Sequence, residues 1–482
     1  MSSRTHKPVL LFAVFTLLVA IVLSACTQQV TPTQSAGPAK PAAEASKSAE
    51  QSAKPTSVPK PEQQPAEQAA AKAQPAASTK PPIKIGLLDP FTGSFALDAK
   101  DNQDGHMLYL EKIGNQVAGR KIELVAEDTE AKGDVALTKA RKLVENDKVN
   151  MVVGTISSAE CYAVAPYFAE KKVPFIVTGN CGAEGLTKDP KMRSPYIWRT
   201  TQTSGMLTYP LSEYLIKNNV KKVVFIATGF AGGYEVADGF AHSFIDLGGT
   251  IVQEIYPAMG TTDFGPFMGQ IKGDADAVVG FVIGTDGLRL AQQYAEYGWK
   301  DKLPLYDISE EIASGPNVAQ LKDAAVGIMP SIHYADDLDT PENQQFRKEF
   351  ETKYKDRIMG HALPAGYAGM QVIATALQTI DANIEDVDKF LGALKKVDIH
   401  TPKGHFKFDD YQNVVEDFYI KKVEKVGGNY VYKTLFTRPD VTQFWNWKPD
   451  ELIKYPYGKL FGKYTNINKE QLDALIKTNS PQ

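Results

Sequence analysis

Two serines and two cysteines lie around a predicted helix in the middle of the chain. Ser157 and Ser158 follow a short apolar run that ends at Gly154, and Cys161 comes one helical turn later. Cys181 lies in a small-residue loop after a second apolar run. Because the carboxyl ends of parallel strands meet at one edge of a sheet, we expect these loops to be neighbours at a ligand-binding edge.

The two serines favour binding of an anionic group. A helix amino end carries free N–H donors and a partial positive charge, and serine hydroxyls add further donors. The alternative is that one of these serines is only a helix N-cap. A catalytic serine is not favoured, because the chain lacks a Gly-x-Ser-x-Gly nucleophile motif.

Other chemistries find little support in the sequence. It contains neither a lysine-bearing phosphate loop nor a dinucleotide fingerprint, so no cofactor is expected. Its seven histidines are scattered without the spacing of a metal site, and we predict no metal. The formal net charge is −4 with both signs mixed, which argues against nucleic acid as a partner.

Residues 1–26 have the pattern of a secretory signal. A basic head precedes an apolar run over 9–23, and Leu23-Ser24-Ala25-Cys26 is typical of a bacterial lipobox. Lipidated Cys26 would hold the protein at the outer face of a membrane or in the periplasm. The alternatives are a plain signal cleaved elsewhere and an uncleaved anchor. Residues 27–82, rich in Ala and Pro, predict a disordered tether.

The remaining two cysteines form an even pair. The chain has three cysteines, and lipid accounts for Cys26. Disulfides persist outside the cytoplasm, so Cys161 and Cys181 are candidates for one. Such a bond would close a loop of about 20 residues and stabilise the fold by about 3 kcal/mol. Whether the bond forms is left open.

The roughly 400 residues after the tether are too long for a single core and suit two α/β lobes. In the first we expect strands at 83–88, 121–126, 151–153 and 175–177, with helices ending near 113 and spanning 135–145. In the second we expect helices at 206–217, 234–246 and 263–272, and one ending near 297. Its strands are expected at 223–226, 251–255, 277–283 and 303–306. Each lobe is therefore predicted to be a doubly wound sheet.

The rest of the chain is expected to return to both lobes. Helices are predicted at 341–355 and 365–379, strands at 405–408 and 418–422, and an aromatic tail that packs on a lobe surface. We assign 83–203 and 332–400 to lobe 1, and 204–331 to lobe 2. Residues 401–437 are assigned to hinge strands and a return to lobe 2, and 438–482 to the tail.

Several motifs resemble one family, the solute-binding lipoproteins of ABC importers typified by leucine/isoleucine/valine-binding proteins. The resemblance covers about 83–437. It rests on Pro90-Phe91-Thr92-Gly93, Gly119-Arg120-Lys121-Ile122-Glu123-Leu124, Ser157-Ser158 with Ala163-Val164-Ala165-Pro166, and Thr262-Asp263-Phe264. It implies a type I binding fold, with two three-layer lobes joined by three strands and closing on a small solute. It also implies a monomeric, non-enzymatic partner of an ABC permease.

The resemblance also implies site residues. Ser157 and Ser158 match the loop that holds a ligand carboxylate. In the next loop, Cys181 stands where relatives that grip an amino group have a hydroxyl. Members that bind aromatic acids look similar in carrying both cysteines, which favours an aromatic or other organic acid over an α-amino acid. The predicted ligand-binding residues are Ser94, Phe95, Ser157, Ser158, Thr178, Asn180, Phe230, Tyr234, Thr285 and Glu310.

Three alternative functions remain open. The same two-lobe module can serve as a ligand-sensing receptor. Glu310 would suit the ammonium of a branched-chain amino acid, although it is also typical of a solvated helix start. An extracellular enzyme would have to show turnover.

Overall fold

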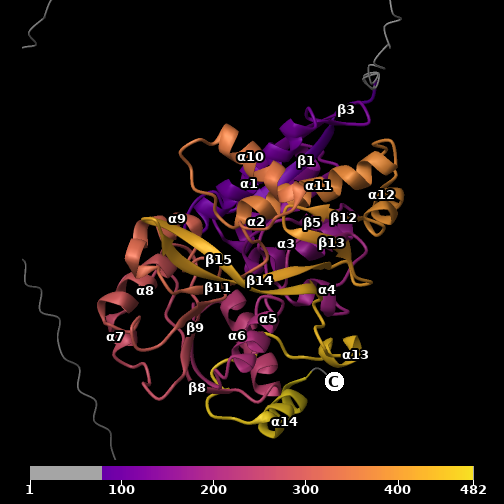
Figure 1. Ribbon diagram of the computed structural model, residues 1–482. Coiled ribbons are helices and arrows are strands. Elements are labelled where there is room, and N and C mark those ends of the chain that lie inside the picture. Colours follow the sequence, from indigo (N-terminus) through magenta and orange to yellow (C-terminus); the bar gives the residue numbers. More distant parts are fainter. Residues whose placement is uncertain (1–78, 481–482) are drawn as a thin grey trace, which may run out of the picture. The chain divides into compact units, whose positions relative to one another are not determined.

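Two sheets organise the computed structural model, which describes residues 79–480 (Figure 1). The predicted signal, the lipidation residue Cys26 and nearly all of the predicted tether lie outside the described residues. Within the described part of the chain, no helix is both long and apolar enough to cross a membrane.

The first sheet has the strand order β2-β3-β1-β4-β5-β6. Its strands are β1 (Ile83–Asp89), β2 (Gln116–Val117), β3 (Arg120–Asp128), β4 (Met151–Gly154), β5 (Phe175–Val177) and β6 (Ile197–Arg199). Apart from the β2–β3 hairpin, neighbouring strands are parallel. Every residue of β4 and β5 is buried, as expected for central parallel strands covered on both faces.

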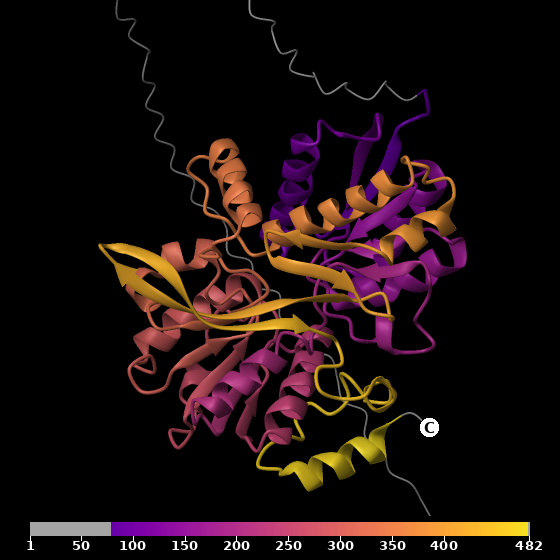
Figure 2. The ribbon, with the colours of Figure 1, turned by 45° about the vertical axis from the view of Figure 1, so that its right-hand side comes forward.

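Helices from two separate parts of the chain cover this sheet. The early ones are α1 (Ala96–Lys112), α2 (Gly133–Arg141) with a π-turn over Lys142–Asn146, α3 (Ser158–Lys171) and α4 (Gly185–Lys188). The later ones are α11 (Ala362–Thr379) and α12 (Val387–Leu394), and α10 (Pro341–Lys353) packs on α1 and α11. Helices α1 and α11 lie side by side (Figures 1 and 2). Gly105 allows this approach, because a Cβ there would lie 2.1 Å from the Leu363 carbonyl oxygen.

The second sheet has the order β12-β13-β14-β11-β10-β9-β7-β8, with β15 paired to β14. Its parallel part consists of β7 (Lys222–Ala227), β8 (Thr250–Ile255), β9 (Ala277–Phe281), β10 (Leu305–Asp307) and β11 (Met329–Ile332). The flanking helices are α5 (Tyr209–Lys217), α6 (Ala231–Asp246), α7 (Gly265–Met268), α8 (Gly284–Glu296) and α9 (Gly315–Leu321), with a 3-10 turn at Lys322–Ala324. The predicted fold class, two α/β lobes, is confirmed.

Antiparallel strands extend the second sheet. They are β12 (Asp398–Thr401), β13 (Gly404–Phe408), β14 (Val414–Val426) and β15 (Asn429–Val441). The chain thus passes between the lobes after β6, after β11 and before β12. Beside the first crossing, the Arg199 N–H donates to the Gln412 carbonyl oxygen at 3.0 Å. The domain bounds given above stay a prediction.

Two expected elements differ from the structure. The helix predicted over 263–272 is only α7, because Gly269 directly follows it in a segment with little helix propensity. The strand predicted over 418–422 is the middle of β14, which forms a long ribbon with β15 (Figure 2). In β15 intermediate and exposed residues alternate, so no apolar run marked it as a strand.

The aromatic tail includes the short helices α13 (Pro449–Leu452) and α14 (Lys469–Asn479). It packs on α5 and α6: Trp445 Nε1 donates to Glu213 at 2.5 Å and Tyr455 donates to the Asp238 carbonyl oxygen at 3.1 Å. It also contacts α4 of the first lobe, where Thr187 donates to Gln443 at 2.7 Å. The tail therefore touches both lobes.

Candidate functional site

A small buried cavity of about 50 Å³ lies between the two lobes. Residues from the carboxyl edges of both sheets, the first crossing segment and the start of α11 line it. The lining residues are Phe95, Ile156, Ser158, Asn180, Gly182, Gln202, Ser204, Leu207, Phe230, Gly232, Phe281, Ile283, Ser309, Glu310, Glu311 and His361. This is the sheet edge that the sequence predicted for ligand binding.

The first lobe presents the start of α3 to the cavity. Ser157 and Glu160 form a capping box, in which the Ser157 N–H donates to Glu160 Oε2 at 3.0 Å. This interaction engages Ser157 in the helix cap and leaves Ser158, the next residue, on the cavity surface. A helix start next to a cavity is a suitable place for an anionic group.

A disulfide joins the two loops that meet here. Cys161 and Cys181 are bonded, with their Cα atoms 6.7 Å apart, and both side chains are fully buried. The bond ties the first turn of α3 to the loop after β5. It therefore fixes the position of Ser158 relative to that loop.

Two amide side chains in the cavity wall have buried polar atoms without protein partners. Both polar atoms of the Asn180 side chain are buried without a hydrogen bond, and so is Gln202 Oε1. Buried polar groups are normally paired, so these atoms point to a ligand or to water. The buried Arg199 holds the surrounding loops, donating to the carbonyl oxygens of Ala183 at 3.2 Å and of Gln202 at 2.6 Å.

Aromatic side chains make up much of the apolar lining. Phe95 comes from the first lobe, whereas Phe230 and Phe281 come from the second. The Phe230 and Phe281 rings are nearly parallel, with centroids 6.2 Å apart. Gly232 keeps this region open, because a Cβ there would lie 2.9 Å from the Phe230 ring. Flat aromatic surfaces of this kind suit a planar ligand ring.

Acidic groups gather at one end of the cavity. Burial raises the pKa of Glu310 to about 7, although His361 nearby lowers it. Burial also raises the pKa of Glu311 well above its ordinary value, and the Asp98 carboxyl adds to the rise. Glu310 Oε1 lies 2.7 Å from His333 Nδ1. No lysine or arginine is among the lining residues, so this end suits hydrogen-bond donors or cations rather than a carboxylate.

The structure brings together half of the predicted ligand-binding residues. Phe95, Ser158, Asn180, Phe230 and Glu310 line the cavity. The other five, Ser94, Ser157, Thr178, Tyr234 and Thr285, are not among its lining residues.

Each of these five has another environment. Ser157 caps α3, and Thr178 Oγ1 accepts from the Gly154 N–H at 3.1 Å. Tyr234 stacks on Phe461 of the tail, with ring centroids 3.6 Å apart. Ser94 and Thr285 are exposed at the amino ends of α1 and α8.

Partial signals in the sequence pointed to some lining residues that the prediction omitted. Gln202, Ser204 and Leu207 lie beside the boundary near 203 that was assigned between the two lobes, and Glu311 neighbours Glu310. His361 carried no local signal, because it reaches the site only through the packing of α11 on α1.

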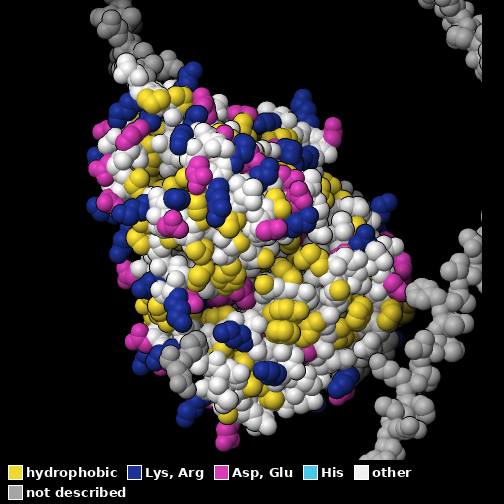
Figure 3. Space-filling model, turned by 180° about the vertical axis from the view of Figure 1, so that it is seen from behind, with side chains coloured by type: hydrophobic (Ala, Val, Ile, Leu, Met, Phe, Trp, Pro, Cys, Tyr) yellow, Lys and Arg dark blue, Asp and Glu magenta, His cyan; other side chains and the backbone are white. Residues whose placement is uncertain are grey.

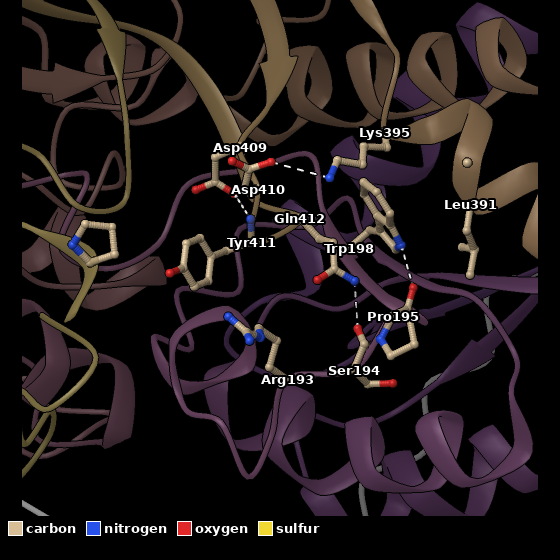
Figure 4. Close-up of a pocket in the computed structure, with 12 residues that line it drawn as sticks. Arg193, Ser194, Pro195, Trp198, Leu391, Lys395, Asp409, Asp410, Tyr411 and Gln412 are labelled. Carbon is tan, nitrogen blue, oxygen red and sulfur yellow. Dashed lines mark hydrogen bonds and ion pairs between the residues drawn. The ribbon is translucent and has the colours of Figure 1, made fainter.

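A second, much larger hollow of about 930 Å³ is lined by residues of the first lobe, the β13–β14 turn and the tail (Figure 4). Several of its polar groups are paired with one another: Gln412 donates to the Ser194 carbonyl oxygen at 2.8 Å, and Lys395 lies 3.4 Å from Asp410. Arg193 stacks over the Tyr411 ring, 4.7 Å from its centroid. We therefore place the candidate site at the inter-lobe cavity, where polar atoms lack partners.

Charges of both signs are interspersed on the surface that Figure 3 shows, in keeping with the small net charge of −4. Neither sign of charge dominates this face, so it does not suggest a second binding site for a charged partner.

Comparisons with known proteins agree on one kind of protein. A family model described as periplasmic binding protein matches residues 82–428. The Leu/Ile/Val-binding protein homolog 6 of Brucella melitensis is 27% identical over 362 residues, which are 74% of this chain and 91% of that protein.

Two solved structures are similar over most of the chain. An ABC transporter substrate-binding protein from Sphaerobacter thermophilus has 35% identity and a TM-score of 0.71, covering 74% of this chain and 98% of that one. A solute-binding protein of an ABC transporter from Rhodopseudomonas palustris, in complex with 3,4-dihydroxybenzoic acid, has 29% identity and a TM-score of 0.70. The similarity covers 75% of this chain and 98% of that protein.

Proposed function

Because this chain belongs to the periplasmic binding protein family, we propose that it captures a small aromatic carboxylate between its lobes and delivers it to an ABC permease. Members of the family are extracytoplasmic solute-binding proteins, and this role requires no chemical reaction. The observation that carries the choice of ligand is the unpaired Asn180 amide beside the start of α3 and the Phe230 ring.

Each part of such a ligand has a matching surface. Its carboxylate would accept from the amino end of α3 and the Asn180 amide, and the Ser158 hydroxyl, which donates to Glu235 in this structure, would turn toward it. Its ring would lie against Phe95, Phe230 and Phe281. The similar protein whose structure holds 3,4-dihydroxybenzoic acid supports this class of ligand.

The cavity requires the lobes to move. At about 50 Å³ it is far smaller than the ~300–1,000 Å³ of typical ligand pockets. Because its lining comes from both lobes and the crossing segment, hinge motion would separate Phe95 from Phe230 and admit a ring.

We further propose that Cys26 carries lipid, which anchors the protein at the membrane beside the permease. The lipobox at 23–26 and the Ala/Pro-rich segment after it support this arrangement. A monomer suits the role, because each chain contains both lobes.

A branched-chain amino acid is the second candidate ligand. The buried Glu310 and Glu311 favour it, because a carboxylate in a cleft is a suitable partner for an ammonium group. In that pose the ligand carboxylate would still lie at the start of α3.

A thermal-shift screen separates the two candidates. Benzoate and its hydroxylated derivatives should raise the melting temperature, because ligand at 100 times its Kd stabilises the folded state by about 2.7 kcal/mol. Leucine, isoleucine and valine should produce little change. A shift with these amino acids alone would replace the aromatic assignment.

A further inference from the structure

Three buried side chains with metal-ligating atoms converge at the acidic end of the cavity. They are Asp98, Glu311 and His361, and one ligand atom from each lies within 4.8 Å of the others. Their exposed fractions are 7%, 8% and 6%, so all three are shielded from solvent. Asp98 is in the first turn of α1, Glu311 follows β10, and His361 immediately precedes α11. The cluster therefore draws on both lobes.

The imidazole of His361 lacks a short contact with these acids. Its Nε2 lies 3.7 Å from Glu311 Oε1 and 3.9 Å from Asp98 Oδ1, beyond hydrogen-bond distance. Glu310 Oε2 is also 3.9 Å away, but Glu310 bonds to His333 through its other oxygen. One ring nitrogen thus faces three carboxyl groups without bonding to any of them.

Among the described residues, no lysine or arginine pairs with Asp98 or Glu311; their carboxyl groups hydrogen-bond to each other, and burial raises the pKa of Glu311, so without a cation the pair favours a shared proton. The two nearby lysines already have carboxylate partners: Lys403 pairs with Glu416, and Lys421 lies 2.9 Å from Asp336. Burying carboxylates is costly unless a counter-charge is close. A small cation among the three side chains would supply that charge.

The separations fit a metal ion with short bonds. Metal–ligand bonds of about 2.1 Å in a tetrahedron place neighbouring ligand atoms about 3.4 Å apart. The observed 3.7 and 3.9 Å from His361 Nε2 are within a few tenths of an ångström of that spacing. One imidazole with two carboxylates is a donor set that suits Zn²⁺ and similar first-row ions.

We propose that Asp98, Glu311 and His361 bind one divalent transition-metal ion of the Zn²⁺ type, with a remaining coordination position toward the cavity. Because the donors come from both lobes, the ion holds the lobes together. Glu311 and His361 also line the cavity, so an oxygen atom of the solute can complete the coordination. The proposal goes beyond the proposed function, since the ion binds whether or not a solute is present.

The spacing of these residues along the chain carries no sign of this site, and no metal was predicted from it. The three residues are far apart in the chain and come together only through the packing of α1, α11 and the loop after β10.

Metal retention tests the proposal directly. The untagged full-length protein is incubated with Zn²⁺, freed of excess by gel filtration, and analysed for metal content. The wild type should retain about one more Zn²⁺ per chain than His361→Ala, with affinity at least about tenfold weaker in Asp98→Asn and Glu311→Gln. All variants are treated in the same way, so zinc bound at other positions contributes equally to each protein and does not affect the difference between them.

His405→Ala is the matched control. His405 also lies beside two carboxylates, 2.8 Å from Asp398 and 3.4 Å from Asp440, but on the surface with both ring nitrogens engaged. Its zinc content should equal that of the wild type. If His361→Ala does not fold, Co²⁺ bound to the wild type gives a second readout. Its visible spectrum should show nitrogen and oxygen ligation and disappear with EDTA.

Two results would overturn the proposal: equal zinc in the wild type and a folded His361→Ala variant, or no Co²⁺ spectrum in the wild type. Neither result depends on the identity of the solute, so failure of the metal site is distinguishable from failure of the aromatic-acid assignment.

Discussion

Ser158 of the first lobe donates a hydrogen bond to Glu235 of the second lobe, with Oγ and Oε2 3.4 Å apart. Tyr162 of α3 and Ser204 of the crossing segment also donate to this carboxyl group. Burial raises the pKa of Glu235 to about 8. Glu235 thus connects the lobes through neighbours of the cavity.

Glu235→Gln should change the pH dependence of stability. Between pH ~4.5 and ~8 the folded protein keeps a proton that the unfolded chain loses. The free energy of unfolding therefore falls as pH rises, by up to about 1.4 kcal/mol per unit. Glutamine removes this contribution, so the variant should gain stability relative to the wild type toward pH 8. Denaturant unfolding across this pH range measures the difference. The exposed Glu123→Gln serves as control, and an unchanged slope in Glu235→Gln would contradict the assignment.

The Cys161–Cys181 disulfide should contribute about 3 kcal/mol to stability, because it closes a loop with a sequence separation of 20. The double variant Cys161→Ser/Cys181→Ser should lose about this amount in urea unfolding. Reductant should destabilise the wild type but leave the double variant unchanged. If both thiols of the non-reduced, folded wild type can be alkylated in intact-mass analysis, the bond is absent.

Asn180→Ala should weaken aromatic-acid binding by about tenfold, the equivalent of one or two hydrogen bonds. Asn180→Asp should weaken it further, because a second carboxylate would face the ligand carboxylate. Equilibrium binding of benzoate measures both effects. Asn218→Ala, an exposed residue on α5's carboxyl end, provides the control. If Asn180→Asp bound benzoate with the affinity of the wild type, Asn180 would not contact the ligand carboxylate.

Much of the fold was predictable because its signals are local. The buried strands β1, β4, β5 and β7 are apolar runs between turn residues, and these predictions match the structure to within one residue at each end. The ribbon β14–β15 was mostly missed, since β15 has no buried apolar run and gains its order by pairing with β14. The helix expected over 263–272 had a local signal that misled. Its apolar residues have helical spacing, but this spacing could not offset its glycines, and the helix in the structure is much shorter.

The site was predictable only where it follows a sheet edge. Ser158 and Asn180 come directly after β4 and β5, so topology alone places them together. Glu311 and His361 meet Asp98 through contacts between distant helices and loops. Tyr234 also shows this limit, because the tail residue Phe461 covers its ring, and local sequence could not reveal that contact.

Cys26→Ser should abolish lipid attachment. In cells fed a labelled fatty acid, the wild type should carry the label and sediment with membranes. The variant should lose the label, because the thiol of Cys26 is the attachment point of the lipobox. Thr27→Ser controls for changes next to the cleavage site. A Cys26→Ser protein that still takes up label would exclude this anchor.

The most direct measurement of the central claim is a calorimetric titration of the purified protein with benzoate, benzyl alcohol and leucine. Benzoate should bind at one site per chain with a negative heat-capacity change, because its ring is buried between Phe95 and Phe230. Benzyl alcohol, which lacks the carboxylate, should bind at least about tenfold more weakly. Saturable binding of leucine with no heat from benzoate would contradict an aromatic carboxylate as the solute.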